Sequence, residues 1–252
     1  MINKNFSEFH KNGWTVIRNF FSKNEIKSYE NKIENFLTKK INSYSGRDIN
    51  FASNKKQVKE INSFHKMHDL PWVRKFSKQK KILILIKKFL NSSPELRASE
   101  LFFKPKKIGL PAPDHQDNFY WKVKNNNALT IWISLSTSDY NNGGVHYYNG
   151  SHKFGILRHE PSYAKGSSQK VYNRKFLKKF KKCTPKLNKG DILVHHALVV
   201  HGSKKNLSNR SRKGWTLQFK DKNSVYDIKA IKLYEKNLNK QIKFRDKCQV
   251  GK

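Results

Sequence analysis

The pair His115 and Asp117 has the residue types and the spacing that could hold a metal ion. Side chains two positions apart leave the same face of an extended strand, so one imidazole nitrogen and one carboxylate oxygen would point at one spot. A third ligand on a neighbouring strand would complete a facial set of two histidines and one carboxylate. That set leaves three positions open and suits non-haem Fe(II) that activates oxygen. His201 is the best candidate for the third ligand, and His195 and His196 compete with it.

An arginine downstream of His201 could bind a second reactant. Arg212 lies eleven residues after His201, and a guanidinium can pair with a carboxylate through two parallel hydrogen bonds. A co-substrate that carries a carboxylate would suit this position. Arg210 competes with Arg212, because the two share strand parity and the face of the strand does not decide between them.

These residues belong to an ordered series of short motifs between roughly residues 10 and 220. The motifs are His115-Gln116-Asp117-Asn118-Phe119-Tyr120-Trp121, Asn142-Gly143-Gly144, Gly150-Ser151-His152-Lys153, Gly190-Asp191-Ile192-Leu193, His201-Gly202-Ser203 and Arg212. The series resembles the phytanoyl-CoA dioxygenase family of Fe(II)/2-oxoglutarate-dependent oxygenases. An isolated His-x-Asp pair is a weak signal, whereas the complete order is fairly specific for the family, though not for a substrate.

The resemblance implies a fold and a cofactor. The fold would be a double-stranded β-helix, a jelly-roll variant with its metal at one open end. Fe(II) would be held by His115, Asp117 and His201, with 2-oxoglutarate and O2 as co-substrates. The family pattern favours His201 over its two competitors because a glycine and a serine follow it. His196 would then line the pocket.

The resemblance also assigns residues to the co-substrate. In the family, the arginine that binds 2-oxoglutarate follows the distal histidine by eleven residues, which selects Arg212 over Arg210. Ser203 would donate a second hydrogen bond to the same carboxylate. Trp132 matches an aromatic position that lines the co-substrate pocket, although core packing explains this residue nearly as well. Thr130 leaves the same strand face as Trp132 and is a weaker candidate.

The strongly basic composition has two explanations. The chain carries 53 Lys and Arg against 18 Asp and Glu, a net charge of +35, which favours a polyanionic partner such as nucleic acid or a membrane surface. However, nine of these residues are arginines and 44 are lysines, scattered from end to end. Nucleic-acid surfaces favour arginine and concentrate charge on one face. A general bias towards Lys, Asn and Ile is the simpler explanation, and nucleic acid is not the expected partner.

Length and residue usage indicate a single domain in a reducing compartment. A chain of 252 residues fits one large barrel or sandwich domain, and 17 Phe, 10 Tyr and 5 Trp can fill its core. No apolar run is long enough to span a membrane. The first residues lack an apolar signal segment, which predicts a cytoplasmic location. Two cysteines are too few for a disulfide framework.

The hydrophobic period divides this single domain, residues 1–252, into three parts. A helical part covers about 1–95, a strand-rich core about 97–220, and a basic helix about 224–247. The fold class is therefore mostly β with flanking helices, as in a sandwich or barrel. The resemblance refines this to a jelly-roll core with a helical N-terminal part.

Three segments carry more specific expectations. Residues 41–70 are polar and aperiodic, which predicts a loop or lid. Residues 82–86 are apolar on all sides, which predicts a buried helix. Residues 158–180 are expected to form an insertion with a short basic helix around Phe176 and Leu177.

The expected activity is hydroxylation of a C–H bond in a small molecule, with release of succinate and CO2. The basic charge favours an anionic substrate. A nucleic-acid demethylase of the same superfamily is an alternative, against which the short interval from His201 to Arg212 and the lack of an arginine-rich patch both count. A catalytically silent binding protein on this scaffold is a further alternative, which the intact ligand set disfavours. The sequence specifies no oligomeric state.

Overall fold

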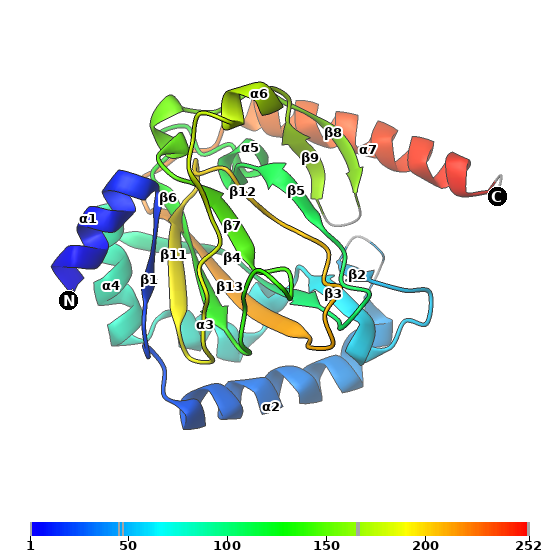
Figure 1. The fold of residues 1–252 in the computed structure, drawn as a ribbon, viewed down its shortest axis with the longest axis horizontal. Helices are drawn as coiled ribbons and strands as arrows, with labels where there is room; N and C mark the ends of the chain where they lie inside the picture. Colours follow the sequence, from blue (N-terminus) through cyan, green and yellow to red (C-terminus); the bar gives the residue numbers. More distant parts are fainter. Residues whose placement is uncertain (1, 45, 47, 165–166, 251–252) are drawn as a thin grey trace.

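Two antiparallel sheets form the centre of the computed structural model, which describes residues 2–44, 46, 48–164 and 167–250 (Figure 1). The strands of the larger sheet are β1 (Trp14–Ile17), β2 (Ile49–Phe51), β3 (Ile61–Phe64), β4 (Pro94–Lys104), β6 (Ala128–Ser134), β11 (Ile192–His196) and β13 (Arg212–Asp221). Those of the smaller sheet are β5 (Ala112–His115), β7 (Val145–Tyr148), β10 (Lys182–Cys183) and β12 (His201–Ser203). This is the mostly β, jelly-roll class that the sequence predicts.

Strand order places distant segments side by side. The larger sheet runs β1-β11-β6-β13-β4-β3-β2 and the smaller runs β10-β7-β12-β5. The central strand β6 is buried at every position, as expected for a run of β-branched and aromatic residues between two neighbours. β13 pairs along its length with β4 and with β6, which fixes the register of the side chains on its inner face.

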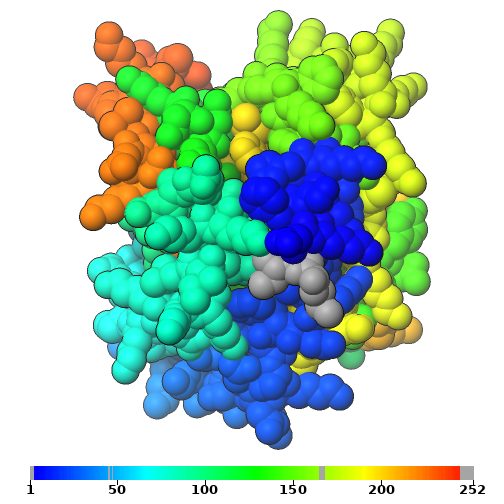
Figure 2. Space-filling model, turned by 90° about the vertical axis from the view of Figure 1, so that its left-hand side faces the viewer, coloured from blue at the N-terminus to red at the C-terminus, as the bar shows by residue number. Residues whose placement is uncertain are grey.

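Four helices cover the outer face of the larger sheet. They are α1 (Ile2–Asn12), α2 (Lys23–Lys40), α3 (Pro71–Ser77) and α4 (Lys80–Leu90). α2 begins at a capping box, in which the Ser22 side chain accepts from the Glu25 N–H and the Glu25 carboxylate accepts from the Ser22 N–H. Figure 2 shows α1, α2 and α4 next to one another on this face, where α4 hydrogen-bonds to both other helices.

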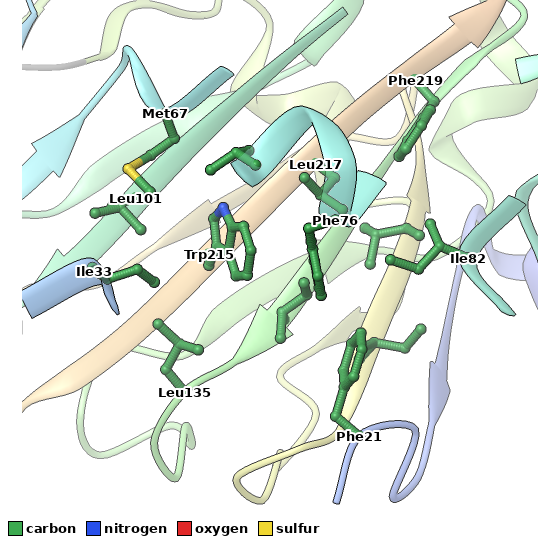
Figure 3. Packing of buried hydrophobic residues seen from close by; sticks show 14 of the residues in the cluster. Phe21, Ile33, Met67, Phe76, Ile82, Leu101, Leu135, Trp215, Leu217 and Phe219 are labelled. Carbon is green, nitrogen blue, oxygen red and sulfur yellow. The ribbon is translucent and has the colours of Figure 1, made fainter. Parts of the chain in front are cut away.

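The main hydrophobic core lies between these helices and the sheet. Trp215 and Leu217 of β13 project from the sheet towards Phe76 of α3 and Ile82 of α4 (Figure 3). The rings of Phe76 and Trp215 are stacked with centroids 4.4 Å apart. The opposite face of the larger sheet looks towards the smaller sheet, so the apolar core stays on one side and the polar cavity described below stays on the other.

The prediction of a loop or lid at 41–70 is wrong. Part of this segment forms β2 and β3, which extend the larger sheet beyond β4, with short 3-10 turns η1 (Ile41–Ser43), η2 (Val58–Glu60) and η3 (Met67–Asp69) around them. Ile61, Phe64 and Met67 are fully buried. Strands of three or four residues carry too little hydrophobic periodicity to be recognised in a polar segment.

Two further expectations need correction. The helix at 82–86 is not buried on all sides, because Ile84 is 59% exposed while Ile82 and Ile86 face the core. The insertion at 158–180 contains the expected short helix, α6 (Arg174–Leu177), but also a hairpin of β8 (His159–Ala164) and β9 (Ser167–Val171).

The remaining helices lie near the smaller sheet. They are α5 (Asp117–Trp121), the 3-10 turn η4 (Ser151–Phe154) and the C-terminal α7 (Ile228–Val250). α7 contacts β8 and α5 (Figure 1), so the predicted C-terminal helix is present. Within the described residues, no helix combines the length and the apolar character needed to cross a membrane.

Candidate active site

The three predicted metal ligands meet between the two sheets. His115 ends β5 and His201 begins β12, and these two residues are direct partners in the antiparallel pair. Asp117 is the first residue of α5, so the strand ends before it. Gln116 between the ligands keeps an extended backbone (φ −116°, ψ 133°), so Asp117 still emerges beside His115. Their ligand atoms lie within 4.8 Å of one another.

Both imidazoles keep one nitrogen free for a metal. His115 Nδ1 lies 2.7 Å from the Pro113 carbonyl oxygen, and His201 Nδ1 lies 3.1 Å from the Val199 carbonyl oxygen. Since a carbonyl only accepts, Nδ1 carries the proton in each ring and Nε2 keeps its lone pair. These Nε2 atoms lie 3.8 Å and 3.6 Å from Asp117 Oδ1, which leaves room for one ion among the three atoms.

The second oxygen of Asp117 is held by the protein. The Thr130 hydroxyl donates to Oδ2 at 2.9 Å, and His195 Nε2 lies 3.0 Å from the same oxygen. His195 Nδ1 in turn lies 3.0 Å from the buried Tyr147 hydroxyl. Oδ1 is therefore the oxygen left facing the two ligand histidines. Supporting hydrogen bonds of this kind orient metal ligands.

The charge state of the three residues suits a cation. Burial alone would raise the pKa of the Asp117 carboxyl, but the nearby imidazoles, His201 foremost, hold this pKa below its usual range. Burial lowers the pKa of His201 to about 3, and the neighbouring His115 adds to the effect. An ionised carboxylate and a neutral imidazole are the forms that bind metal ions.

Two family motifs fix the backbone around the ligands. The buried Gln116 side chain donates to the carbonyls of Gly155 and Leu198 and accepts from the Leu157 N–H, so the turn between His115 and Asp117 is tied to the segment before His201. Ser151 of the Gly150-Ser151-His152-Lys153 motif accepts from the N–H of Val200, the residue before His201. These motifs therefore set the relative position of the ligands.

Arg212 lies in the same cavity as the three ligands. Its side chain is 3% exposed, its Nε has no hydrogen-bond partner, and its Cζ lies 5.3 Å from the centroid of the Trp132 ring. Burial lowers the pKa of Arg212 to about 10, which leaves it a cation at neutral pH. A Cβ at Gly214 would overlap the Trp132 ring, so this glycine provides the space in which the ring lies.

The other predicted residues divide between the cavity and the rest of the molecule. Ser203 and Trp132 line the cavity, as does Thr130, whose hydroxyl donates to Asp117. Arg210 lies at the surface and pairs with Asp139 at 2.8 Å. The expectation that His196 lines the pocket is wrong: β11 alternates, so His195 faces the cavity and His196 packs against Phe9 and His152 on the other side.

The cavity has a volume of about 810 Å³ and a second polar region beyond the ligands. Its wall there includes His65, Arg97, Glu100 and Gln218, with aromatic side chains between them and apolar side chains of α7 opposite. Sequence reasoning missed these residues, since they come from three separate segments, β4, β13 and the loop after β3, and share no motif. Within the motif at 118–121, Tyr120 and Trp121 line the cavity, while Asn118 is buried and bonds the Val123 backbone.

The residues present fit the groups that the family pattern implies. Two free imidazole nitrogens and one carboxylate oxygen form a three-sided donor set, which is the ligand set of non-haem Fe(II) centres with open positions. Arg212 presents a buried cation without a carboxylate partner in the described chain, in a cavity that the hydroxyl-bearing Ser203 also lines. A dicarboxylic keto acid such as 2-oxoglutarate would pair with it.

A jelly roll with two histidines and one carboxylate between its sheets defines the class of non-haem iron oxygenases. The model of the phytanoyl-CoA dioxygenase (PhyH) family matches residues 9–214, and the chain belongs to this family of oxygenases. It is 24% identical over 249 residues to the peroxisomal phytanoyl-CoA dioxygenase of Bos taurus, covering 93% of this chain and 72% of the relative. It is 26% identical over 254 residues to phytanoyl-CoA dioxygenase domain-containing protein 1 homolog of Dictyostelium discoideum, covering 84% and 89%.

Solved structures share the fold. EctD from S. alaskensis with bound Fe superposes with a TM-score of 0.73 at 18% identity, covering 89% of this chain and 78% of that chain. The same protein with 2-oxoglutarate and 5-hydroxyectoine gives 0.72 at 18% identity, covering 89% and 77%. SnoN, an alpha ketoglutarate dependent epimerase from nogalamycin biosynthesis, gives 0.70 at 18% identity, covering 89% and 85%. At these identities the comparison shows the jelly-roll architecture.

Proposed function

We propose that this protein is an Fe(II)/2-oxoglutarate-dependent hydroxylase of a small anionic molecule. His115, Asp117 and His201 would hold the iron, and Arg212 with Ser203 would hold the far carboxylate of 2-oxoglutarate. The observation that carries the proposal is the convergence of three metal-ready ligand atoms and an unpaired, buried guanidinium in one cavity.

The metal would supply the redox chemistry: with O2, 2-oxoglutarate is converted to succinate and CO2, and one oxygen atom enters a C–H bond of the substrate. The protein supplies geometry and a water-poor cavity. Thr130 and His195 hold Asp117 Oδ2, so that Oδ1 points at the metal position. The Pro113 and Val199 carbonyls hold the ligand imidazoles with Nε2 inward.

The co-substrate residues act through charge and stacking. Arg212 sits where water cannot screen it, so a carboxylate that reaches it forms a charge-assisted, two-point contact. Trp132 lies over the guanidinium and restricts its rotation. Thr130 supports the proposal in a different way from the one expected, since its hydroxyl orients the metal carboxylate instead of contacting 2-oxoglutarate.

An anionic substrate agrees with the charge balance. The chain carries a net charge of +35, which raises the local concentration of small anions and their association rate. The cavity is large enough, at about 810 Å³, to hold 2-oxoglutarate and a second small molecule.

Succinate formation measured over a panel of small metabolites tests this proposal. Purified protein with Fe(II), ascorbate, 2-oxoglutarate and O2 should release succinate above its uncoupled background with at least one small acid, and mass spectrometry should find that acid heavier by one oxygen. The Asp117→Ala variant is the matched control and should give background only. Succinate release that no compound raises above background, from protein that binds Fe(II) and 2-oxoglutarate, would contradict the hydroxylase assignment.

A further inference from the structure

Two arginines of the cavity share the same unusual surroundings. Arg97 and Arg212 each carry a buried Nε without a hydrogen-bond partner. Each guanidinium lies over a tryptophan ring, with Cζ 4.8 Å from the centroid of Trp121 for Arg97 and 5.3 Å from that of Trp132 for Arg212. The ion pairs that arginines form within the described residues belong to other positions. Because an uncompensated cation in a low-dielectric site is costly, both are suited to receive an anion.

A β-bulge turns Arg97 into the cavity. On β13, Gln218 pairs with Ala98 and Phe219 pairs with Leu96, so Arg97 is the extra residue on β4. In a regular strand, residues three apart such as Arg97 and Glu100 would lie on opposite faces. The bulge instead puts both on the cavity wall, in agreement with the frequent use of bulges to redirect side chains at active sites.

A hydrogen-bonded chain accounts for the other charges around Arg97. Arg97 Nη1 donates to Gln218 Oε1 at 2.5 Å, and Gln218 Nε2 donates to Glu100 Oε2 at 2.6 Å. The other Glu100 oxygen lies 2.9 Å from His65 Nδ1. Burial works against charge on both partners, yet His65 holds the pKa of Glu100 below its usual range and Glu100 raises the pKa of His65. Glu100 therefore pairs directly with His65 and reaches Arg97 only through Gln218, so no carboxylate of the described residues contacts the Arg97 guanidinium directly.

The register places Arg97 next to the metal position. Gln218, to which Arg97 is bonded, pairs across the sheet with Thr130, and Thr130 holds the Asp117 carboxylate. Arg212 lies six residues before Gln218 on the same strand, roughly 20 Å of backbone away at about 3.3 Å per residue. The two arginines therefore lie towards opposite ends of the cavity, and Arg97 adjoins the strand position that supports the metal ligand Asp117.

We infer that Arg97 binds the oxyanion, a carboxylate or a phosphate group, of the molecule that is oxidised. The inference rests on the proposed function, because it takes Arg212 to be occupied by 2-oxoglutarate. A guanidinium fork matches either group through paired hydrogen bonds. Since Arg97 adjoins the metal ligands, the carbon that is oxidised lies within a few bonds of the anionic group.

Apolar and aromatic side chains of the same cavity determine the rest of the substrate. Leu238 and Ile242 of α7, with Phe102 of β4 and Tyr120 of α5, line the same cavity. Tyr234 of α7 is anchored there by a 2.8 Å hydrogen bond with Ser168 of β9. Apolar and aromatic surface of this kind favours a hydrocarbon or aromatic body. The substrate class is therefore a small amphiphilic acid with its charged end at Arg97.

Paired charged and neutral probes test the assignment. Hexanoate, hexanamide and hexyl phosphate share one chain and differ in the head group. Each is titrated by calorimetry into anaerobic protein loaded with Fe(II) and saturating 2-oxoglutarate. The wild type should bind hexanoate or hexyl phosphate at least about tenfold more tightly than hexanamide, as a charge-assisted contact predicts. The head group preferred in this titration identifies the anion as carboxylate or phosphate.

Three variants separate Arg97 from general charge effects. Arg97→Gln keeps a donor for Gln218 and should lose the tenfold preference while hexanamide binds as before. Arg97→Lys should keep part of the preference, because the charge stays and the fork is lost. Arg210→Gln removes an exposed arginine that pairs with Asp139 and should keep the whole preference. An anion preference that survives in Arg97→Gln, or one that is absent from the wild type, would overturn the inference.

The same samples distinguish this inference from the proposed function. The dissociation constant of 2-oxoglutarate should change less than about twofold in Arg97→Gln, because Arg212 lies at the other end of the cavity. Failure of wild-type protein to bind 2-oxoglutarate would contradict the proposed function. The head-group preference is then measured on the metal-free protein, where loss of the preference on Arg97→Gln would still support the oxyanion site.

Discussion

The two ends of the cavity, one at Arg212 and one at Arg97, both present a buried cation, but the sequence encodes the two positions differently. Each presents a guanidinium over a tryptophan ring and lacks a carboxylate partner in the described chain. Arg212 follows His201 at a fixed interval on the next strand, so its position can be recognised along the chain. Arg97 depends on a bulge and on residues from β4, β13 and the loop after β3. The comparison indicates that the co-substrate end is encoded locally and the substrate end by tertiary structure.

Substitution of a metal ligand between the two ends should reduce activity the most. His115→Ala or Asp117→Ala removes a ligand, so the weak visible charge-transfer band of iron-bound 2-oxoglutarate should disappear in anaerobic protein, and succinate formation should fall by at least about 1,000-fold. Absorption spectra of folded variants, checked by circular dichroism, measure this. A band that survives in either variant would show that the ligand is misassigned.

Substitution at the Arg212 end should have the next largest effect, a rise in the 2-oxoglutarate concentration that activity requires. Arg212→Ala leaves the far carboxylate of 2-oxoglutarate in a buried site without its cation, so the concentration needed for half-maximal activity should rise by about 100-fold. Arg210→Ala is the matched control because its side chain is exposed and pairs with Asp139, and it should change that concentration less than twofold. Equal effects of the two substitutions would overturn the choice of Arg212.

Removing a residue that hydrogen-bonds to Asp117 should weaken iron binding less than removing a metal ligand does. His195→Phe removes the 3.0 Å contact to Asp117 Oδ2 but leaves the Thr130 bond, so Fe(II) affinity should fall by about tenfold. At saturating iron the 2-oxoglutarate requirement should stay close to that of the wild type, and the charge-transfer band should shift in position. Thr130→Val should act in the same direction, and the double variant should lose more than either one. Unchanged iron affinity in the double variant would remove both residues from this role.

The smallest expected effect is on the pH dependence of stability. It concerns His196, the neighbour of His195 that faces away from the cavity. In the folded protein burial lowers the pKa of His196 to about 3, whereas an unfolded histidine titrates near 6.5. Between these values the unfolded chain binds a proton that the folded protein does not, so stability falls as pH drops below about 6.5. From pH 7 to pH 5 this one group should cost about 2 kcal/mol.

Urea unfolding of metal-free protein at both pH values measures this effect. His196→Asn keeps an acceptor for the Leu198 N–H, which bonds His196 Nδ1 at 3.0 Å, and removes the titration. Its loss of stability between pH 7 and pH 5 should therefore be smaller than that of the wild type. Equal losses in the two proteins would contradict the assignment of a buried, neutral His196.

The sequence predicts those parts of the molecule that depend on neighbours in the chain. The capping box at Ser22 and Glu25, the β-branched and aromatic run of β6 and the short His-x-Asp motif all follow from residues close together in the chain. The jelly-roll class follows from the succession of helices and short strands together with the family pattern. In each case, the pattern can be read along the chain without knowing which distant segments pair.

The rest could not be predicted because it is set by contacts between distant segments. β2 and β3 are short strands in a polar segment, and their structure is decided by the pairing of β3 with β4 and of β2 with β3. Arg97 would be placed on the wrong face by simple alternation, since the bulge opposite Gln218 and Phe219 is invisible in the sequence. His195 and His196 could be given opposite faces by parity, but which of them faces inward depends on how β11 pairs with β6.

Anomalous diffraction from anaerobic crystals soaked with Fe(II) and 2-oxoglutarate tests the central claim most directly. The account predicts one iron peak bonded to His115 Nε2, Asp117 Oδ1 and His201 Nε2, with the far carboxylate of 2-oxoglutarate paired to Arg212 and the Arg97 end of the cavity left for substrate. An iron peak that is not bonded to all three residues, or 2-oxoglutarate bound at Arg97 instead of Arg212, would contradict it.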